Sequence, residues 1–155
     1  MFMETQGQFA SNRTGDDRLS ICISEDLGIC VRSLVAFSAG DVLDRFSGAI
    51  GPELTQHSLQ VSPGQHITGT RFVGLLSHSC DPNCRLDMER FELIARRDIA
   101  AGDLLMIDYA ETEDVLYNQF ACGCGASDCR SWIIGRKDDV NQAGRHVLAI
   151  RDGQA

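Results

Sequence analysis

Hydrophobic residues in this chain come in short runs, several of which alternate with polar residues. Alternation over a few positions is typical of half-buried strands, and the runs are bounded by Gly, Asp, Ser and Pro, which favour turns. Glu89-Arg90 separates two of the runs as the turn of a hairpin would. Strands are predicted at 19–24, 29–37, 42–50, 58–61, 66–68, 85–88, 91–96 and 104–108. The pattern therefore predicts a mainly β domain.

Helical patterns are scarce in the chain. Residues 110–120 are polar and fit either a short helix or a loop. The tail has weak helical spacing at Val140, Val147 and Ile150, and Gly144 interrupts it. We therefore expect at most a short helix near the C-terminus.

Residues 71–84 read RFVGLLSHSCDPNC and combine an apolar run with a polar turn. The run at 72–76 predicts a buried strand. The Asp-Pro-Asn after it predicts a sharp turn, because proline fixes its own φ and restricts the residue before it. Two cysteines, Cys80 and Cys84, lie in this turn. Taken alone, the stretch fits a surface turn with one core-facing cysteine as well as it fits a functional site.

Composition and charge narrow the class of protein. A length of 155 residues suits one domain with its own core, and no apolar run approaches the ~20 residues of a membrane span. The polar start of the chain is unlike a secretory signal. A net charge of −8 argues against a basic face for nucleic acid, and fits either solubility or attraction of a cationic substrate. Seven cysteines then favour a reducing, intracellular compartment and metal binding over disulfides.

Three of these cysteines, Cys122, Cys124 and Cys129, form a C-x-C-x4-C pattern among glycines and small residues. A structural zinc ion takes four ligands, so a fourth must come from elsewhere, and Cys80 is the best candidate. Zinc would then hold the cysteine-rich segment against the turn at 71–84 and close a pocket between them. The alternative is a set of reduced, unliganded surface thiols, which so dense a cluster would expose to oxidation.

Four segments of the chain resemble the SET-domain methyltransferase family. LSHSCDPNC at 76–84 is similar to its asparagine-histidine-serine-cysteine motif, and ARRDIAAGDLLMIDY at 95–109 to its strands ending in aspartate-tyrosine. CGCGASDCRSWIIG at 122–135 resembles its post-SET zinc segment, and LGICVRSLVAFSAGDVLDRFSG at 27–48 its glycine-containing N-terminal part. The matches occur in family order over roughly residues 20 to 135, and the chain resembles a small, divergent member.

The resemblance implies a mainly β fold of several small sheets, with a C-terminal segment threaded under a loop as a pseudoknot. It also implies S-adenosylmethionine as methyl donor, zinc in the post-SET region, and a channel that delivers the acceptor from the opposite side. On this basis we divide the chain into a flexible lead-in (1–18), a SET-like core (19–118), a post-SET zinc segment (119–136) and a tail or short helix (137–155).

Family roles transfer to the donor site residue by residue. Gly28, Ile29 and Cys30 fall in the loop whose backbone approaches the methionine part of the donor. Ser77 and His78 occupy the positions that hold its amino and adenine groups.

Tyr109 matches the catalytic tyrosine, which also contacts the donor, and Trp132 is placed to cover the adenine. Methyl transfer from a sulfonium is an in-line displacement, so alignment of nucleophile, methyl and sulfur matters most. Oxygen atoms such as the tyrosine hydroxyl can hold the methyl by weak C–H···O contacts. The zinc ligands implied by the resemblance are Cys80, Cys122, Cys124 and Cys129.

The sequence departs from the family pattern at five positions. Ser77 replaces an asparagine, Gly74 an arginine, and Cys30 the second glycine of the donor loop. Phe46 replaces a tyrosine of the tyrosine-x-glycine signature, and Ile107 replaces an aromatic residue that lines the lysine channel. The donor site and zinc segment are therefore the parts retained, and the acceptor channel is the part altered.

Further residues are assigned to the acceptor side by their place in the chain. The segment between Gly48 and Arg71, which helps to bind peptide in lysine-methylating relatives, is short here. Gln60 and His66 flank its central turn and join Phe46 and Ile107 as candidates for the channel, although a lone histidine near a turn is more often structural. Tyr117 and Phe120 fit either the core or a pocket wall, with the core preferred, and His57 is expected on the surface.

Three functions are open at this point. The first is a SET-type methyltransferase using S-adenosylmethionine, with a protein lysine as default acceptor. The second is a SET-like enzyme acting on a small molecule, by methylation or donor-assisted chemistry. The third is a non-catalytic interaction module that binds S-adenosylmethionine or is stabilised by zinc. We expect no direct contact with nucleic acid or membrane, and a cytoplasmic or nuclear location.

Overall fold

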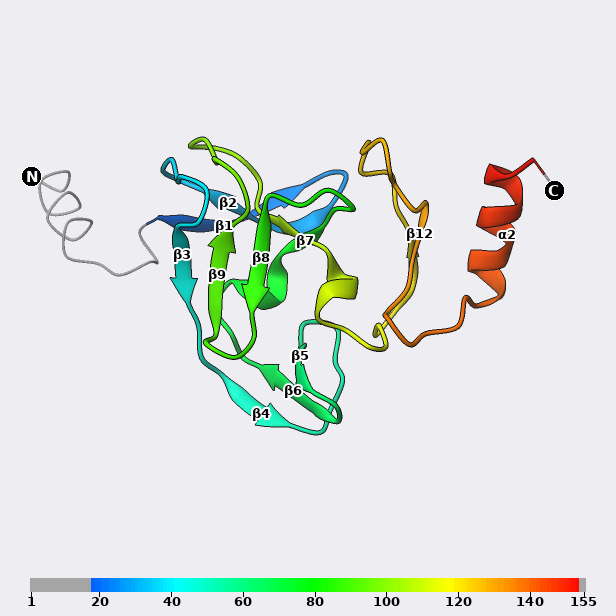
Figure 1. Cartoon of the computed structure of the whole chain (residues 1–155), viewed down its shortest axis with the longest axis horizontal. Helices are drawn as coiled ribbons and strands as arrows, with labels where there is room; N and C mark the ends of the chain where they lie inside the picture. The colour runs from blue at the N-terminus through cyan, green and yellow to red at the C-terminus, as the bar shows by residue number, and fades with distance from the viewer. Residues whose placement is uncertain (1–17, 154–155) are drawn as a thin grey trace, which may run out of the picture.

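The computed structural model describes residues 18–153. The predicted lead-in, 1–18, therefore lies outside the described residues apart from Arg18. Within this range the strands form several small sheets around a common centre, and a single α-helix lies at the C-terminal side of the molecule (Figure 1). The prediction of a mainly β domain is confirmed.

Two sheets have three strands each. Their strand orders are β3 (Val42–Arg45), β9 (Glu92–Ala95), β8 (Cys84–Asp87) and β4 (Ala49–Gly51), β6 (Gln65–Thr68), β5 (Leu59–Ser62). The three remaining sheets pair β1 (Leu19–Ser24) with β2 (Gly28–Ser33), β7 (Ser77–His78) with β10 (Met106–Ile107), and β11 (Phe120–Ala121) with β12 (Trp132–Ile133). β7 and β10 run parallel, whereas the other pairs are antiparallel.

The predicted hairpin around Glu89-Arg90 is confirmed as β8–β9. The carboxylate of Asp87 accepts hydrogen bonds from the backbone N–H groups of Glu89 and Arg90, each at 3.0 Å. A short polar side chain that binds the backbone two and three residues ahead stabilises a tight turn.

Two predicted strands are shorter than expected. The strand predicted at 29–37 ends at Ser33. The strand predicted at 42–50 is divided into β3 and β4, because the chain bends at Phe46–Gly48 to leave one sheet and enter another. Gly48 makes the bend possible, since a Cβ there would lie 2.2 Å from the carbonyl oxygen of Thr68.

The prediction of a strand at 72–76 is wrong. Residues Val73–Leu75 form a 3₁₀ turn (η2), which leads into the short strand β7. The apolar run predicted burial correctly, since Phe72, Val73 and Leu76 are buried. A short apolar run does not by itself distinguish a strand from a helical turn. Here Gly74 fits against the carbonyl oxygen of His57, where any side chain would clash.

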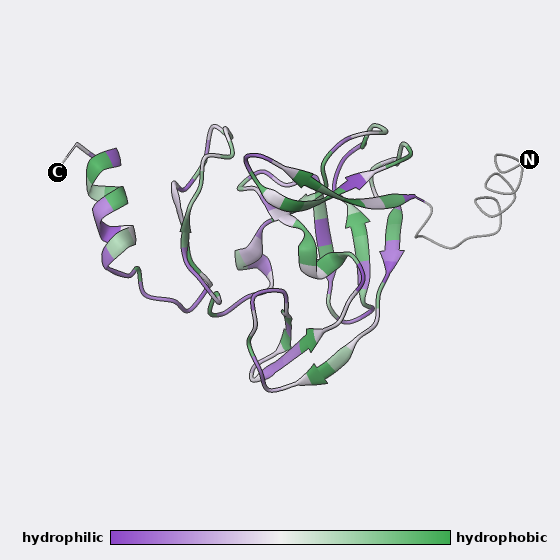
Figure 2. Cartoon of the chain, turned by 180° about the vertical axis from the view of Figure 1, so that it is seen from behind, coloured by the Kyte–Doolittle hydropathy of each residue, from purple (hydrophilic) through white to green (hydrophobic). Residues whose placement is uncertain are grey.

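The core lies where the three-stranded sheets meet η2 and β10. Figure 2 shows hydrophobic residues, in green, distributed over the strands of this central part of the chain. Full burial of each large aliphatic side chain is worth about 1.5–3 kcal/mol, which makes this cluster the main source of stability. Its fully buried members include Leu43, Ile67, Val73, Leu93, Ile99, Leu105 and Ile107.

Asn83 joins the polar turn after β7 to the segment that carries β10. Its side-chain oxygen accepts from the backbone N–H of Met106 at 2.9 Å, and its side-chain nitrogen donates to the carbonyl of Leu104 at 2.8 Å. The amide thus occupies two backbone groups as a neighbouring strand would. This contact fixes the turn at 71–84 beside the residues that precede Tyr109.

The C-terminal part of the chain packs beside the core as a hairpin and a helix (Figure 1). After η3 (Tyr109–Glu111) the chain forms β11, the cysteine-rich loop and β12, and ends in α2 (Gln142–Arg151). The helix is capped by Asn141, whose side chain accepts from the N–H of Gly144 at 2.9 Å. Gly144 was expected to interrupt the helical pattern, but it lies inside the helix. None of the helices within residues 18–153 has the length and apolar character that a membrane span requires.

Candidate active site and cysteine cluster

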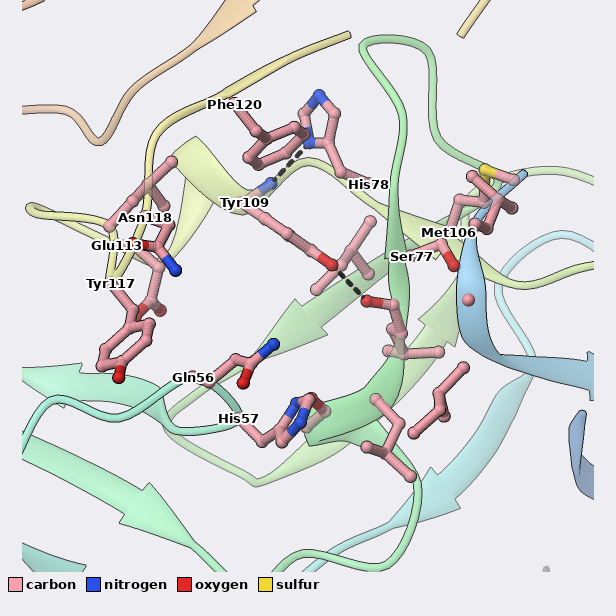
Figure 3. A pocket seen from close by; sticks show the side chains of 18 of the residues that line it. Gln56, His57, Ser77, His78, Met106, Tyr109, Glu113, Tyr117, Asn118 and Phe120 are labelled. Carbon is pink, nitrogen blue, oxygen red and sulfur yellow. Dashed lines mark hydrogen bonds between the residues drawn. The ribbon is translucent and has the colours of Figure 1, made fainter. Parts of the chain in front are cut away.

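A cavity of about 920 Å³ lies between four parts of the chain (Figure 3). We call one side the motif wall, formed by Gly28, Ile29, Ser77, His78 and residues 106–107. The other side, formed by residues 54–59, Glu113 and residues 116–118, is called the loop wall. The residues between the walls include Tyr109, Phe120 and the first residues of the cysteine-rich loop.

Tyr109 enters the cavity from η3. Its hydroxyl donates to the carbonyl of Leu76 at 2.6 Å, which fixes the ring and leaves the oxygen lone pairs available. Burial raises the pKa of the hydroxyl to about 12, so the group is neutral at physiological pH. A neutral, oriented hydroxyl at this place can accept weak contacts from a ligand and hold it in one orientation.

His78, on β7, lies beside Tyr109 and is held by the backbone at the start of η3. Its Nδ1 accepts from the backbone N–H of Tyr109 at 3.2 Å, which places the proton of the neutral ring on Nε2. Burial lowers the pKa of His78 to about 4, opposed by Asp108 and reinforced by Arg130. His78 therefore acts as a neutral, positioned ring at physiological pH.

Three aromatic rings meet at this point. The ring centroids of His78, Tyr109 and Phe120 lie 5.2 to 5.8 Å apart in edge-to-face arrangements. Such pairs are favourable and restrict ring rotation. Phe120 lines the cavity, so the pocket-wall alternative holds for it and the preferred core position is wrong.

Several other residues line the cavity. His57 is exposed, as expected, and also lines the cavity. Tyr117 lines the cavity and is 55% exposed, which agrees with a pocket wall and not with the core. Met106 and Asn118 line it as well; Met106 lies in the segment 95–109 that resembles the family, whereas no motif marks Asn118.

Two of the three residues predicted for the donor loop line the cavity, and the third does not. Gly28, at φ 72°, and Ile29 line the cavity from the β1–β2 turn. Cys30 is buried and absent from the cavity lining; its Sγ lies 2.8 Å from Sγ of Cys22, its partner across the hairpin. Burial, together with Cys22, raises the pKa of Cys30 to about 11, so the thiol stays protonated.

Ser77 lies on the motif wall and is 6% exposed. Its hydroxyl has no hydrogen-bond partner among the described residues. A buried hydroxyl without a partner costs free energy unless a ligand or water completes it. Ser77 is therefore available to a polar group of a ligand in the cavity.

Of the four residues predicted for the acceptor channel, Ile107 lines the cavity. Phe46 is buried and packs on Phe91, with ring centroids 5.4 Å apart. Gln60 and His66 are buried opposite each other on β5 and β6, behind the loop wall. The structure thus separates these residues, and their role in a channel stays a prediction.

The four predicted zinc ligands are brought together by the fold. The Sγ atoms of all four cysteines lie within 4.8 Å of one another, and each cysteine is partly buried. Tetrahedral Zn–S bonds of about 2.3 Å place sulfurs roughly 3.8 Å apart, so the cluster fits zinc after a small contraction. The members are Cys80, Cys122, Cys124 and Cys129.

Arg130 connects the cysteine cluster to the aspartate-tyrosine segment. Its backbone N–H donates to Sγ of Cys80 at 3.4 Å, and its guanidinium donates to Asp108 at 2.7 Å. Asp108 in turn accepts from the backbone N–H of Ala110 and so caps η3, the turn that carries Tyr109. Three segments distant in sequence therefore meet at one ion pair.

Trp132 lies on β12 and faces α2. Its indole N–H donates to the side-chain oxygen of Gln119 at 2.9 Å. The ring packs directly on Gly144, where a Cβ would lie 2.2 Å from Nε1. Trp132 is absent from the cavity lining in this arrangement, and its contact with adenine stays a prediction.

The site can now be compared with known proteins. Residues 28–110 match the SET domain, the family of that name. Methyltransferase flvH of Aspergillus flavus is 36% identical over 110 residues, which cover 69% of this chain and 62% of that protein. Histone-lysine N-methyltransferase trr of Drosophila melanogaster is 34% identical over 64 residues, 37% of this chain and 3% of its own length. The chain thus spans less than two thirds of the length of these relatives.

Solved structures agree with this match. A crystal structure of KRYPTONITE in complex with mCHH DNA, an H3(1-15) peptide and SAH is 25% identical, with a TM-score of 0.60. The similarity covers 74% of this chain and 29% of that one. The small sheets are therefore arranged as in a SET-domain structure, while the predicted threading of the C-terminal segment stays an implication of the resemblance. Because the SET-domain match covers more than half of the 155 residues, this chain belongs to the SET-domain family.

Proposed function

We propose that this chain is an S-adenosylmethionine-dependent methyltransferase of the SET type, with a protein lysine as default acceptor. The observation that carries the proposal is the cavity lined jointly by Gly28, Ser77, His78 and Tyr109, all within or beside segments that resemble the family's motifs. The similarity to proteins named as methyltransferases, and to a structure that contains SAH, supports it. Their histone-directed members also favour an intracellular site of action.

The residues on the motif wall fit the donor. The unpartnered hydroxyl of Ser77 can bind a polar group, and the neutral ring of His78 offers a flat surface beside it. Gly28 has no side chain and exposes its backbone to the cavity. S-adenosylmethionine would supply the methyl group on a positively charged sulfur.

Tyr109 would orient the reacting groups. Its hydroxyl oxygen, held by the bond to Leu76, can accept C–H···O contacts from the polarised methyl. Each such contact is weak, about 0.5–1 kcal/mol, so the main benefit is alignment of the methyl with the nucleophile.

The cysteine cluster would hold zinc in a structural role. Four thiolates complete the tetrahedron and leave no open position for a reacting water. Through Arg130 the ion would stabilise the turn that carries Tyr109.

A small-molecule acceptor is the second candidate. The match to methyltransferase flvH extends over 110 residues, against 64 for the histone enzyme trr, and the name of flvH specifies no acceptor. Ile107 in place of an aromatic residue also alters the cavity wall.

The test has two steps. Calorimetry with S-adenosylmethionine should show binding of one donor per chain, whereas no binding would leave only the zinc-module function. SAH release is then measured with an H3 tail peptide, free L-lysine and n-butylamine. Faster turnover of the peptide supports a protein acceptor, and faster turnover of the free amines supports a small molecule.

The assigned role of Tyr109 is tested by Tyr109→Phe. We expect the turnover rate to fall on the order of 100-fold, the range for loss of one oriented hydrogen-bonding group at a reacting centre. Donor affinity should change less than threefold, because the ring and its packing remain. Full turnover in this variant would show that the hydroxyl has no part in the reaction.

A further inference from the structure

The loop wall contains a buried carboxyl group that the SET motifs do not include. Glu113 is 5% exposed and lines the cavity beside Tyr117 and Asn118 (Figure 3). One carboxyl oxygen accepts from the backbone N–H of Gln60 at 2.8 Å, and the Thr112 side chain also hydrogen-bonds to the carboxyl group. Among residues 18–153, Glu113 takes part in no ion pair.

An acidic group in this position is costly to the folded protein. Burial removes water from the carboxylate, and that cost is ordinarily offset by a cation close by. In Glu113 the burial raises the pKa, which records that no protein cation fully compensates the charge. A group with these properties in a cavity wall is a candidate for ligand binding.

The charged neighbours of Glu113 have other partners or lie behind it. Arg136 and Lys137 pair with Asp114, at 3.0 and 3.8 Å. His66 lies on β6 opposite Gln60, where a positive charge on it would lower the pKa of Glu113, and its Nδ1 has no hydrogen-bond partner among the described residues. The cavity side of the carboxyl group is therefore the side left for a cation.

Glu113 and Tyr109 face the same space. The backbone N–H of Glu113 donates to the carbonyl of Tyr109 at 3.0 Å, which is the i to i+4 contact of a helical turn. Both residues line the same cavity, with the Tyr109 hydroxyl directed toward Leu76 and Glu113 lying beside Tyr117 and Asn118 (Figure 3). A ligand that extends across the cavity would therefore contact both residues.

We propose that Glu113 binds the protonated amino group of the acceptor and takes up its proton before methyl transfer. The inference rests on the proposed function and specifies its acceptor as an aliphatic amine. In the first step an N–H bond of the ammonium breaks and an O–H bond forms on Glu113. The free amine then forms a bond to the methyl carbon while the carbon–sulfur bond breaks, and sulfur keeps the electron pair as a neutral thioether.

This role solves a chemical problem of the reaction. An alkylamine with a pKa of about 10.4 is almost fully protonated at pH 7 and has no lone pair for attack. A carboxylate first attracts the ammonium and then accepts its proton, so the amine becomes nucleophilic only when it is in place. General-base assistance of this kind contributes typically 10²- to 10⁴-fold in rate.

Binding is tested with n-butylamine, its neutral counterpart n-butanol, and protein saturated with SAH. We expect calorimetry to show at least tenfold tighter binding of the amine than of the alcohol in the wild type, and equal binding in Glu113→Gln. The matched control is Glu111→Gln, which removes a carboxylate from the same segment but outside the cavity, and should keep the preference. An unchanged preference in Glu113→Gln would overturn the proposal.

Proton uptake is tested by the pH dependence of kcat/KM, with the amine that turns over fastest. The wild-type value should be nearly constant between pH 7 and 9, because Glu113 supplies the base. Glu113→Gln should be at least 100-fold slower at pH 7 and recover about tenfold per pH unit, following the free-amine fraction. Parallel profiles in the two proteins would rule out the base role.

These outcomes are separable from failure of the proposed function. If donor binds but no amine is methylated, the methyltransferase proposal fails, while the calorimetric comparison still decides whether Glu113 is a cation site. Donor affinity and melting temperature report whether Glu113→Gln is folded. If it is not, Glu113→Asp is used; it keeps the charge and should retain the amine preference, and loss of the preference in this folded variant would contradict a cation site.

Discussion

The motif wall and the loop wall of the cavity reach a defined structure by different routes. Ser77 and His78 on the motif wall sit on a strand that pairs with β10, and the zinc ligand candidate Cys80 follows directly. Residues 113–118 of the loop wall form no strand; polar contacts to Gln60 on β5 and backbone hydrogen bonds from residues 136 and 137 hold them instead. One wall is therefore fixed by strand pairing next to the cysteine cluster, and the other largely by isolated contacts of side-chain amide and carboxyl groups.

This difference between the two walls indicates which of them can change its ligand specificity by substitution. A wall made of backbone pairs and cysteine ligands tolerates few substitutions, which suits a cofactor that is the same in every family member. A wall held by side chains can be altered one residue at a time while the sheets remain. Glu113 belongs to this second wall, and under the proposed function its carboxyl group lies on the surface that would meet the acceptor.

The largest expected effect comes from the cluster behind the motif wall. Cys129→Ser should remove the zinc, which we expect at about one ion per chain, and lower donor affinity on the order of 100-fold, because ligand loss also frees Arg130 and the turn it supports. Metal analysis and calorimetry with S-adenosylmethionine measure the two quantities. Cys22→Ser, which changes a cysteine outside the cluster, should alter neither. Retention of zinc in Cys129→Ser would contradict the four-cysteine site.

The next effect concerns the loop wall. Gln60→Met keeps the length of the side chain but removes both of its hydrogen bonds to Asp114. In the wild type the Gln60 side-chain oxygen accepts from the backbone N–H of Asp114 at 2.7 Å, and the Gln60 side-chain nitrogen donates to the Asp114 carboxylate at 2.8 Å. We expect the free energy of unfolding to fall by about 1 kcal/mol, because the partly buried N–H of Asp114 then loses its protein partner. KM for the acceptor should rise several-fold while donor affinity stays constant.

Thermal unfolding and separate donor and acceptor titrations test this division. Gln65→Met is the control, since it removes an exposed amide from the adjacent strand β6. An equal loss of donor and acceptor affinity in Gln60→Met would show that the two walls are not independent.

The sequence predicted the motif wall better than the loop wall for a physical reason. Short motifs such as the paired cysteines and the aspartate-tyrosine carry their spacing in the sequence, so the four thiols could be predicted to converge, and they do. Glu113 has no such mark: among 22 acidic residues, its burial depends on a contact with Gln60, 53 positions away. Long-range pairing also decided the misassigned segment 72–76, where contact with His57 favoured a turn over a strand.

The smallest expected effect tests the connection between the cysteine cluster and Tyr109. Arg130→Gln removes the ion pair with Asp108, whose partners are 40% and 17% exposed, so solvent already weakens it. We expect the free energy of donor binding to weaken by about 1 kcal/mol or less, which is an up to fivefold loss of donor affinity, while the zinc content stays unchanged. Arg130→Lys should restore part of the loss, because one donor can still reach Asp108. Arg97→Gln, which breaks an exposed pair with Asp81, serves as the matched control. If both glutamine variants bind the donor as the wild type does, zinc and the active site communicate through the backbone of residues 78–80 rather than through Arg130.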